Sequence, residues 1–484
     1  MSKIDLNKSW KYSEALEASD HIRLKEKYEL FINGKFVKPN SKKYFHTINP
    51  ATDEVIAKIA EANKKDVDIA VKSARLAFKS WSTLASKERG KYIFRIARMI
   101  QERAKEFAII ESIDGGKPIR ESRDIDIPLA ANHFFYYAGW ADKLEYVFPN
   151  KIPTALGVAG QIIPWNFPLL MAAWKIAPAI ACGNTVVLKP AETTSLTALK
   201  LAELIKDSGL PKGVVNIVTG ASKTGAAIVN HPDVNKIAFT GSTEVGKLIE
   251  RSLAGINKKT TLELGGKGAN IIFDDAAIDQ AVEGIINAIF FNQGHVCCAG
   301  SRLFVQESIS KTVIEKLKDR MASLILGDPL DKNTDIGAIN SKAQLKIIKN
   351  YIKIGTKDGG EIYQSKCNIP KKGNWCPPTL FLNVSQSHRV FQEEIFGPVL
   401  AIQTFRTIDE VIEKANNTPF GLSAGVWTEK GSKIFKLTNE LNAGVVWANT
   451  YNKFDPTSPF GGFKESGVGR EGGLHGLQSY LKFE

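Results

Sequence analysis

The sequence predicts an α/β protein built from more than one domain. A chain of 484 residues is too long for one ordinary hydrophobic core, so two or three domains are expected. The hydrophobic fraction of 43% and the charged fraction of 24% are ordinary for a soluble globular protein. From about residue 156 onward, short apolar segments alternate with amphipathic ones. Strands that alternate with helices predict a parallel sheet covered on both faces.

The net charge of +13 raises the question of a nucleic-acid partner. The lysines are scattered, however, and pairs such as Lys42-Lys43 and Lys371-Lys372 resemble solvated surface. No dense basic run with interleaved aromatic residues is present in the sequence. We therefore expect no nucleic-acid partner, and an anionic substrate or cofactor would use the same positive field.

The cysteines and the N-terminus bear on compartment and metal content. The five cysteines are Cys182, Cys297, Cys298, Cys367 and Cys376. Their number is odd and no spacing matches a metal site or a disulfide framework, which suits a reducing compartment. The N-terminus lacks an apolar signal core, and its acidic residues, Asp5, Glu14 and Glu17, argue against a transit peptide. A cytoplasmic protein without a bound metal is expected.

The first 150 residues predict an extension, a hairpin and helices. Residues 1–27 are polar and weakly periodic, which favours a surface helical extension. The segment 31–35, with Asn33-Gly34 at its centre, predicts a hairpin turn between two strands. Between residues 67 and 107 the apolar spacing is helical, with Ile69, Ala70 and Ala74 on one face.

One uncharged stretch, residues 152–174, could be mistaken for a membrane span. It is interrupted by Pro153, Pro164 and Pro168, and it contains Gln161 and Asn166. A transmembrane helix would not be expected to contain these residues. The stretch instead predicts a buried strand, a loop and a buried helix, so no membrane association is expected.

The alternation between residues 156 and 264 predicts a Rossmann-like unit with a parallel sheet. Its expected strands span 156–163, 185–188, 214–218, 236–239 and 260–264. Its expected helices span 169–180, 196–206, 225–229 and 244–253. A second α/β run follows from residue 270 to about 460, beginning with a strand at 270–273, a helix at 278–291 and a strand at 302–305.

Two features of this unit could bind a nucleotide, although the usual G-x-G-x-x-G fingerprint is absent. The Thr240-Gly241-Ser242-Thr243 turn lies between a strand end and a helix start, where free N–H groups favour a pyrophosphate. A simple βα turn also favours Gly and Ser. The second feature is Lys189 with Glu192 after a strand, at the edge where a ribose would lie. A surface ion pair is the alternative interpretation.

Three residues in separate motifs supply the groups that acyl chemistry at an aldehyde carbon needs. Cys297 follows F-F-N-Q-G-H-V, Glu263 lies in L-E-L-G-G-K, and Asn166 lies in P-W-N-F-P. The thiol would attack, the amide would stabilise the oxyanion, and the carboxylate would activate water. The alternatives are a cysteine that only packs and an asparagine that caps a helix before Pro168. Packing is our interpretation for the other cysteines, and Cys298 is expected to be a bystander.

These motifs, in this order, resemble the aldehyde dehydrogenase superfamily from about residue 31 to residue 480. The resemblance implies oxidation of an aldehyde to a carboxylic acid with NAD(P), through a thiohemiacetal and a thioester on Cys297. Glu263 would be the general base for hydrolysis, and Asn166 with the Cys297 N–H would form the oxyanion hole. Lys175 and Glu471 match a pair that relays protons. The alternatives are a coenzyme-A-acylating semialdehyde dehydrogenase, which typically lacks this glutamate, and a non-catalytic structural protein on the same fold.

The resemblance also implies a cofactor site. Its expected residues are Ile162, Pro164, Trp165, Lys189, Glu192, Gly220, Gly225, Phe239, Gly241, Ser242, Gly265, Glu394 and Phe396. Lys189 and Glu192 would contact the adenosine ribose, and Glu394 would hold the nicotinamide ribose. NAD is expected to be preferred, because Glu192 would repel the 2′-phosphate of NADP, although NADP stays possible. His295 stands where the family typically has Gln, which is expected to alter local hydrogen bonding.

An aromatic substrate tunnel is implied in the same way. Its expected residues are Phe167, Met171, Trp174, Phe291, Phe454 and Phe460. Such a tunnel suits apolar or aromatic aldehydes. These side chains could equally pack in a core.

The resemblance divides the chain into four parts. They are an N-terminal extension (1–27), an NAD-binding domain (28–141 and 157–264), an α/β catalytic domain (265–463) and a small β oligomerisation element (142–156 and 464–484). Tetrameric relatives have a longer insertion where this chain has the segment 140–157, and this chain ends soon after Tyr480. Both differences favour a homodimer.

Overall fold

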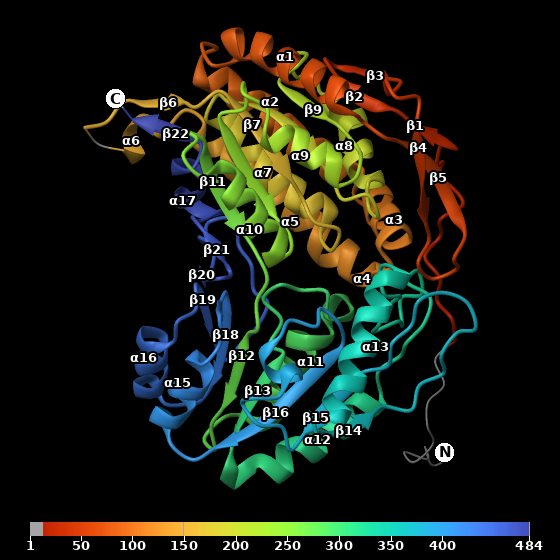
Figure 1. Cartoon of the computed structure of the whole chain (residues 1–484), viewed down its shortest axis with the longest axis vertical. Helices are drawn as coiled ribbons and strands as arrows, with labels where there is room; N and C mark the ends of the chain where they lie inside the picture. The colour runs from red at the N-terminus through yellow and green to blue at the C-terminus, as the bar shows by residue number, and fades with distance from the viewer. Residues whose placement is uncertain (1–12, 149, 484) are drawn as a thin grey trace, which may run out of the picture.

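The computed structural model describes residues 13–148 and 150–483 and shows two α/β units, one above the other in Figure 1. The chain passes to the second unit along the green segment of Figure 1, from β11 (Lys259–Glu263) to β12 (Ala269–Ile272), and its C-terminal part returns to the first. The mixed α/β architecture with parallel sheets confirms the predicted fold class.

The first unit is built on an eight-stranded sheet in the order β21-β11-β10-β7-β8-β9-β2-β3. Its parallel strands are β7 (Val158–Ile162), β8 (Thr185–Lys189), β9 (Val215–Ile217), β10 (Lys236–Thr240) and β11. Antiparallel strands flank them: β2 (Leu30–Ile32), β3 (Lys35–Val37) and β21 (Gly467–Val468). The strand order reverses between β7 and β10, and the carboxyl ends of such strands are where α/β folds bind ligands.

Helices cover both faces of this sheet, as the alternation of apolar segments predicts. One face packs against α1 (Lys64–Trp81), α9 (Ser222–Val229) and α10 (Thr243–Leu253). The other packs against α7 (Pro168–Ala181) and α8 (Leu196–Asp207), with α2 (Ser86–Glu102), α3 (Ala104–Gly115) and α5 (Ile127–Trp140) outside them. The uncharged stretch 152–174 thus forms a buried strand, a loop and a helix that starts at Pro168, which confirms that prediction. Among the described helices, none is both long and apolar enough to cross a bilayer.

The N-terminal region follows one prediction and corrects another. The Asn33-Gly34 hairpin is confirmed, with φ of 51° and 72° at its two central residues. The predicted helical extension is wrong for residues 13–26, which form no helix, while residues 1–12 lie outside the described part. Leu16 instead forms a β-bridge with Asp331. Tertiary hydrogen bonds to that loop replace the intrahelical ones, because the segment lacks an apolar stripe for a helix to bury. A three-stranded sheet of β1 (Lys27–Tyr28), β4 (Tyr44–Ile48) and β5 (Val55–Ala60) follows.

The second unit has a seven-stranded sheet in the order β14-β15-β16-β13-β12-β18-β19. All neighbours are parallel except the edge strand β14. The strands are β13 (Arg302–Gln306), β14 (Glu361–Gln364), β15 (Thr379–Leu382), β16 (Val399–Phe405), β18 (Ser423–Trp427) and β19 (Val445–Ala448). The helices are α11 (Ile278–Phe290), α12 (Ser310–Ala322), α13 (Lys342–Lys357), α14 (Arg389–Gln392), α15 (Ile408–Asn416) and α16 (Gly431–Glu440).

A short two-stranded sheet pairs β6 (Pro153–Ala155) with the C-terminal strand β22 (Leu481–Phe483). It projects from the body beside α6 (Leu144–Val147) and α17 (Gly473–Gln478) in Figure 1. The ring centroids of Phe148 and Phe483 lie 4.9 Å apart. A second small pair joins β17 (Phe420–Gly421) to β20 (Phe463–Lys464).

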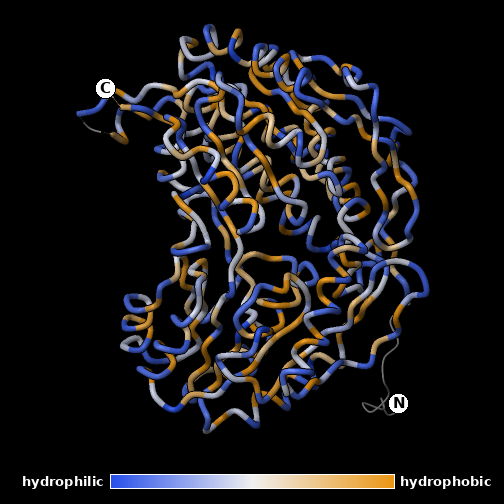
Figure 2. The backbone as a smooth tube through the Cα atoms, viewed as in Figure 1, coloured by the Kyte–Doolittle hydropathy of each residue, from blue (hydrophilic) through white to orange (hydrophobic). Residues whose placement is uncertain are grey.

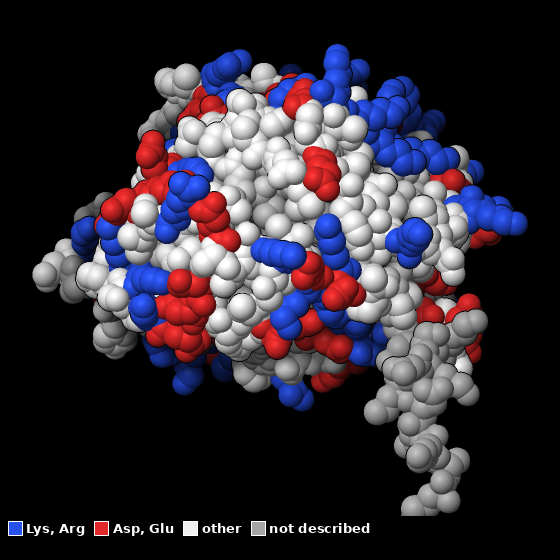
Figure 3. Space-filling view, turned by 90° about the horizontal axis from the view of Figure 1, so that it is seen from below, with Lys and Arg blue, Asp and Glu red and all other residues white. Residues whose placement is uncertain are grey.

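Hydropathy and charge follow this layering. Figure 2 shows hydrophobic segments in the strands and in the helices beside them, and hydrophilic segments around the rim. On the face shown in Figure 3, basic and acidic side chains are interspersed and border a broad uncharged area. Mixed charge of this kind gives no single-sign field on that face.

Candidate active site

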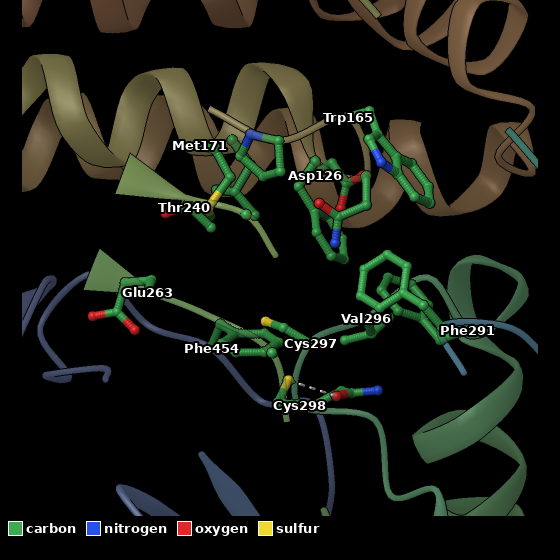
Figure 4. Close-up of a pocket in the computed structure, with 18 of the residues that line it drawn as sticks. Asp126, Trp165, Met171, Thr240, Glu263, Phe291, Val296, Cys297, Cys298 and Phe454 are labelled. Carbon is green, nitrogen blue, oxygen red and sulfur yellow. Dashed lines mark hydrogen bonds between the residues drawn. The ribbon is translucent and has the colours of Figure 1, made fainter. Parts of the chain in front are cut away.

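A cavity of about 700 Å³ opens between the two units, at the carboxyl ends of β7, β10 and β11. Figure 4 shows Cys297, Glu263 and Phe454 on its lower side and Trp165, Met171 and Thr240 on its upper side. Its walls come from segments that lie far apart in the sequence, namely 124–132, 164–174, 240–244, 263–265, 287–298, 344–351, 394–396, 452–460 and 471.

Cys297 follows α11 and a short 3₁₀ turn, η2 (Phe291–Gly294). Within this turn, Asn292 and Gln293 have left-handed backbones with φ of 49° and 54°. Cys297 is partly exposed on the cavity wall, whereas its neighbour Cys298 is buried. A Cβ atom added at Gly266 would lie 2.4 Å from the Cys297 carbonyl oxygen, so only glycine allows this approach.

Asn166 is joined to the Cys297 loop by two hydrogen bonds. Its Nδ2 donates to the His295 carbonyl oxygen at 2.8 Å, and its own carbonyl oxygen accepts from Asn292 Nδ2 at 2.8 Å. The helix-cap alternative is not observed, because α7 has Phe167 at its N-cap and no side-chain cap hydrogen bond. One N–H of the Asn166 amide therefore stays available toward the cavity.

The His295 ring packs in a cluster with two aromatic side chains that also contact each other. Its centroid is 4.7 Å from that of Trp165 and 5.9 Å from that of Phe396. Burial, together with the charge of Lys117, lowers the pKa of His295 to about 3, so the ring is neutral. At the position where the expected motif has glutamine, this chain thus has a neutral ring that packs against Trp165. The backbone carbonyl of His295 accepts the hydrogen bond from Asn166.

Glu263 ends β11 and is buried, unlike an ordinary solvated glutamate at a strand end. Neither of its carboxyl oxygens has a hydrogen-bond partner in the described part of the chain. Burial and the charge of Glu471 raise its pKa well above the usual value, opposed by Lys175. This shift favours the neutral form of the carboxyl group, which lies in a wall shared with Cys297.

The predicted pair of Lys175 and Glu471 is present and buried. Lys175 Nζ donates to both carboxylate oxygens of Glu471 at 2.6 Å. The Thr261 hydroxyl donates to Glu471 Oε1 at 3.2 Å, and Lys236 Nζ donates to Thr261 Oγ1 at 3.1 Å. Burial lowers the pKa of Lys236 to about 7. Sequence reasoning missed Thr261 and Lys236, although a lysine in the otherwise apolar strand Lys236–Thr240 was a signal.

The predicted cofactor residues form two groups. The first lines the cavity and consists of Pro164, Trp165, Gly241, Ser242, Gly265, Glu394 and Phe396. Glu394 Oε1 accepts the Gly266 N–H at 3.0 Å, and burial raises the pKa of Glu394 to about 7. A Cβ at Gly265 would lie 2.3 Å from Glu394 Oε2. Ser242 Oγ accepts the Val245 N–H at the start of α10.

The second group lies beyond the cavity wall, around the end of β8. Lys189 Nζ donates to the carbonyl oxygens of Pro190 at 2.8 Å and Gly220 at 2.7 Å, and lies 3.7 Å from Glu192 Oε2. A Cβ at Gly225 would approach Lys189 Cε at 3.5 Å and Ile162 Cδ1 at 3.6 Å. Phe239 packs beneath Gly241, where a Cβ would lie 2.5 Å from its ring. Both groups thus lie near the point where the strand order reverses.

The six predicted tunnel residues all line the cavity. Trp174, Phe454 and Phe460 pack with ring centroids 5.8 to 6.4 Å apart, and Phe167 stacks 6.1 Å from Phe291. The same six side chains also belong to the hydrophobic core or pack against it, so they have both positions at once. His133, which sequence reasoning missed, lies 4.4 Å from Trp174 between ring centroids, and burial lowers its pKa to about 3.

A second set of buried charges, also missed, lies beneath the Cys297 loop. It consists of Glu111, Lys117, Glu121 and Asp126. The only sequence signal was the density of charges in residues 117–126, which resembles a solvated helix. Neither these residues nor any other His, Cys, Asp or Glu side chains of the described part have the arrangement of a metal site.

Comparison with known proteins supports one family. The family model for the aldehyde dehydrogenase family matches residues 36–484. The chain is 46% identical over 469 residues to the mitochondrial aldehyde dehydrogenase of Rattus norvegicus, covering 94% of this chain and 90% of that one. It is 45% identical over 488 residues to retinal dehydrogenase 2 of Homo sapiens, covering 96% and 94%.

Solved structures agree with these relatives. The NAD⁺ complex of an aldehyde dehydrogenase from Bacillus cereus superposes with a TM-score of 0.92 and 42% identity, covering 96% of this chain and 98% of that one. An indole-3-acetaldehyde dehydrogenase in complex with NAD⁺ gives a TM-score of 0.92 and 39% identity, covering 95% and 96%.

Proposed function

This chain belongs to the aldehyde dehydrogenase family, and on that premise we propose that its cavity performs NAD-dependent oxidation of an aldehyde through Cys297. The observation that carries this assignment is the meeting of Cys297, Asn166 and Glu263 on one cavity, from three distant segments. A packing role explains neither Cys297, which is partly exposed, nor Glu263, which lacks a hydrogen-bond partner among the described residues.

The residues of the cleft fit NAD. Gly241 and Gly265 leave no room for a Cβ, so backbone can pass close to a bound group. The α10 N-terminus supplies N–H groups for a pyrophosphate, and Lys189 with Glu192 suits a ribose. Glu394 would hold the second ribose. When bound, NAD⁺ supplies the acceptor for the hydride that leaves the substrate carbon.

In the first half of the reaction, the Cys297 thiolate attacks the aldehyde carbon and forms the thiohemiacetal oxyanion. The free N–H of the Asn166 amide and the Cys297 backbone N–H stabilise that oxyanion, which contributes about 10²–10³ in rate per donor. Loss of hydride leaves a thioester on Cys297.

In the second half, Glu263 takes a proton from water, and the resulting hydroxide attacks the thioester. The carboxylic acid leaves and the thiolate returns. The charge of Lys175 opposes the raised pKa of Glu263 and so favours the carboxylate form, which is the form that accepts the proton from water. This arrangement favours hydrolysis over acyl transfer to coenzyme A.

The cavity favours an apolar or aromatic aldehyde. Six apolar side chains, five of them aromatic, line the cavity that holds Cys297, which polar side chains such as Asn132 and Asn287 also line. A panel of short, long, aromatic and quaternary-amine aldehydes, followed by NADH production, would rank these classes. Equal kcat/KM for a quaternary-amine and an aromatic aldehyde would contradict this preference.

Assembly as a homodimer and a cytoplasmic location complete the proposal. Val245 and Leu248 are 41% and 54% exposed, one helical turn apart on α10, which suits an interface with a second copy. The pair of β6 and β22, with residues 142–156 and 464–484 around it, would be the oligomerisation element. The five cysteines are all free thiols, which is typical of a reducing compartment.

Cys297→Ala tests the assignment directly. Dehydrogenase and esterase activity should both be lost, because no other group forms the thioester, while NAD⁺ binding measured by fluorescence titration stays. Turnover above a few per cent of wild type would reject the nucleophile.

A further inference from the structure

A buried cluster of four ionisable side chains lies beneath the Cys297 loop: Glu111, Lys117, Glu121 and Asp126. Each is at most 6% exposed. Lys117 bonds to Asp126 and lies 3.7 Å from Glu111 Oε1, while its Nζ lies 4.1 Å from the centroid of the Phe167 ring. Two carboxyl groups thus pair with the one lysine, and Glu121 is the member without a salt bridge among the described residues.

The local backbone explains why Glu121 and Asp126 both point inward. Glu121 ends a short helix, α4 (Ile119–Glu121), and a π turn, η1 (Ser122–Asp126), follows at once. The Ile127 N–H donates to the Ser122 carbonyl, five residues back. Residues five apart lie on one side of such a turn, so Glu121 and Asp126 are buried while Asp124 between them is exposed.

Glu121 contacts the most strained part of the Cys297 loop. Its Oε2 accepts the Asn292 N–H at 2.9 Å, and Asn292 and Gln293 both have left-handed φ angles without being glycine. Asn292 Nδ2 in turn donates to the Asn166 carbonyl oxygen. A conformation disfavoured for L-residues persists only where its surroundings hold it, and such positions cluster at active sites.

We propose that Glu121 is a positioning residue for the reaction: by accepting the Asn292 N–H, it fixes the left-handed turn that presents Cys297 and anchors Asn166. The same cluster reaches the other side of the site, because Glu111 Oε2 accepts the Leu169 N–H near the start of α7. The inference rests on the proposed role of Cys297 as the nucleophile.

The role needs an acceptor oxygen and does not need a negative charge. Burial raises the pKa of Glu121 to about 8, opposed by the charge of Lys117, so the group is largely neutral at neutral pH. The carbonyl oxygen of a neutral acid still accepts a hydrogen bond. Glutamine keeps that oxygen, whereas methionine has a similar volume and lacks it.

The experiment compares Glu121→Met with Glu121→Gln. In the Met variant kcat should fall by about 10²-fold, since a displacement near 1 Å has that effect, and NAD⁺ affinity should not change. The rate at which iodoacetamide alkylates Cys297, followed by mass spectrometry of its peptide, should fall in parallel. The Gln variant should stay within about threefold of wild type on both readouts, because the acceptor remains.

Asp114→Leu is the matched control. Asp114 is also buried, on α3, and Oδ2 accepts the Leu196 N–H at 2.9 Å, away from the cavity. Loss of the Asp114 carboxylate should lower the Tm and leave the rate of Cys297 alkylation unchanged. If Glu121→Met does not fold, Glu121→Asp, which withdraws the oxygen by one methylene, replaces it with a smaller expected loss.

Two results would overturn the inference. One is a folded Glu121→Met enzyme with wild-type kcat and alkylation rate. The other is a Gln variant as impaired as the Met variant, which would show that charge matters and not the acceptor. Failure of the proposed function would give a different result. If Cys297 is not the nucleophile, Cys297→Ser retains turnover, whatever the Glu121 variants show.

Discussion

Replacing Glu263 by glutamine separates the chemistry of this carboxyl group from its structural role. Both carboxyl oxygens are buried without a hydrogen-bond partner in the described residues, so the change breaks no protein hydrogen bond. It removes the general base for hydrolysis, which is worth about 10²–10⁴ in rate. That range corresponds to about 3–5 kcal/mol in the barrier to deacylation. Acylation of Cys297 does not use this base and should survive.

The same substitution has a pH-dependent effect on stability. The pKa of Glu263 is raised in the fold above its ordinary value of 4.5, so folding favours the neutral form. The stabilisation that this group gives to the fold is therefore fully present below pH 4.5, and it is lost as pH rises through the raised pKa of the folded state. Glutamine stays neutral throughout. Relative to wild type, the free energy of unfolding of the variant should rise by about 1.4 kcal/mol for each pH unit above 4.5, until the pH reaches the raised pKa of Glu263.

Two measurements check these expectations. Stopped-flow absorbance should show a burst of NADH near one equivalent per Cys297 site, followed by a stall, in the glutamine variant. Thermal unfolding at one scan rate should show the Tm of the variant rising above that of wild type between mildly acidic and mildly alkaline pH. Steady turnover at the wild-type rate without a burst would refute the base assignment. A Tm difference that does not change with pH would refute the burial argument.

Three further expectations follow from the same geometry. Glu192→Gln should narrow the preference for NAD over NADP, because the carboxylate near Lys189 would repel a 2′-phosphate; a wild-type enzyme that prefers NADP by kcat/KM would contradict it. Glu471→Gln should lower the free energy of unfolding, measured by denaturant unfolding, by about 3–5 kcal/mol, because it leaves the Lys175 ammonium buried without its carboxylate. The double variant that also carries Lys175→Met should recover stability. Unchanged unfolding of the single variant would reject that reasoning. Light scattering at micromolar concentration should give the mass of two chains, since the segment 140–157 is too short for the strands that join dimers into tetramers; a mass of four chains would show another contact surface.

Local patterns were enough to predict most of the framework. Between residues 156 and 305 the strands are short apolar runs and the helices have an apolar period of 3.6, and both signals depend on neighbours within about ten residues. The turn at Asn33-Gly34 is specified in the same local way, because these two residues tolerate the left-handed backbone that a tight hairpin needs. The extended strap at residues 13–26 escaped prediction because its hydrogen bonds go to a loop more than 300 positions away.

The residues of the site also fall into two groups, those that local motifs identify and those that only long-range contacts identify. The sequence by itself identified Cys297, Glu263 and Asn166 through their motifs, together with the α/β fold class. Only the tertiary structure decided that Asn166 bonds to the His295 carbonyl, that Lys236 joins Thr261 beside Glu471, and that Glu121 supports the Asn292 turn. Each of these contacts except the one between Lys236 and Thr261 joins positions more than a hundred residues apart.

The physical reason is that burial is a property of the assembled fold. A carboxyl group in a chain segment has its ordinary pKa until packing removes water from both of its oxygens, as at Glu263 and Glu121. Residue identity and spacing therefore determine which groups are available to react. The packing of two α/β units around one cavity determines which of them meet, and in which protonation state.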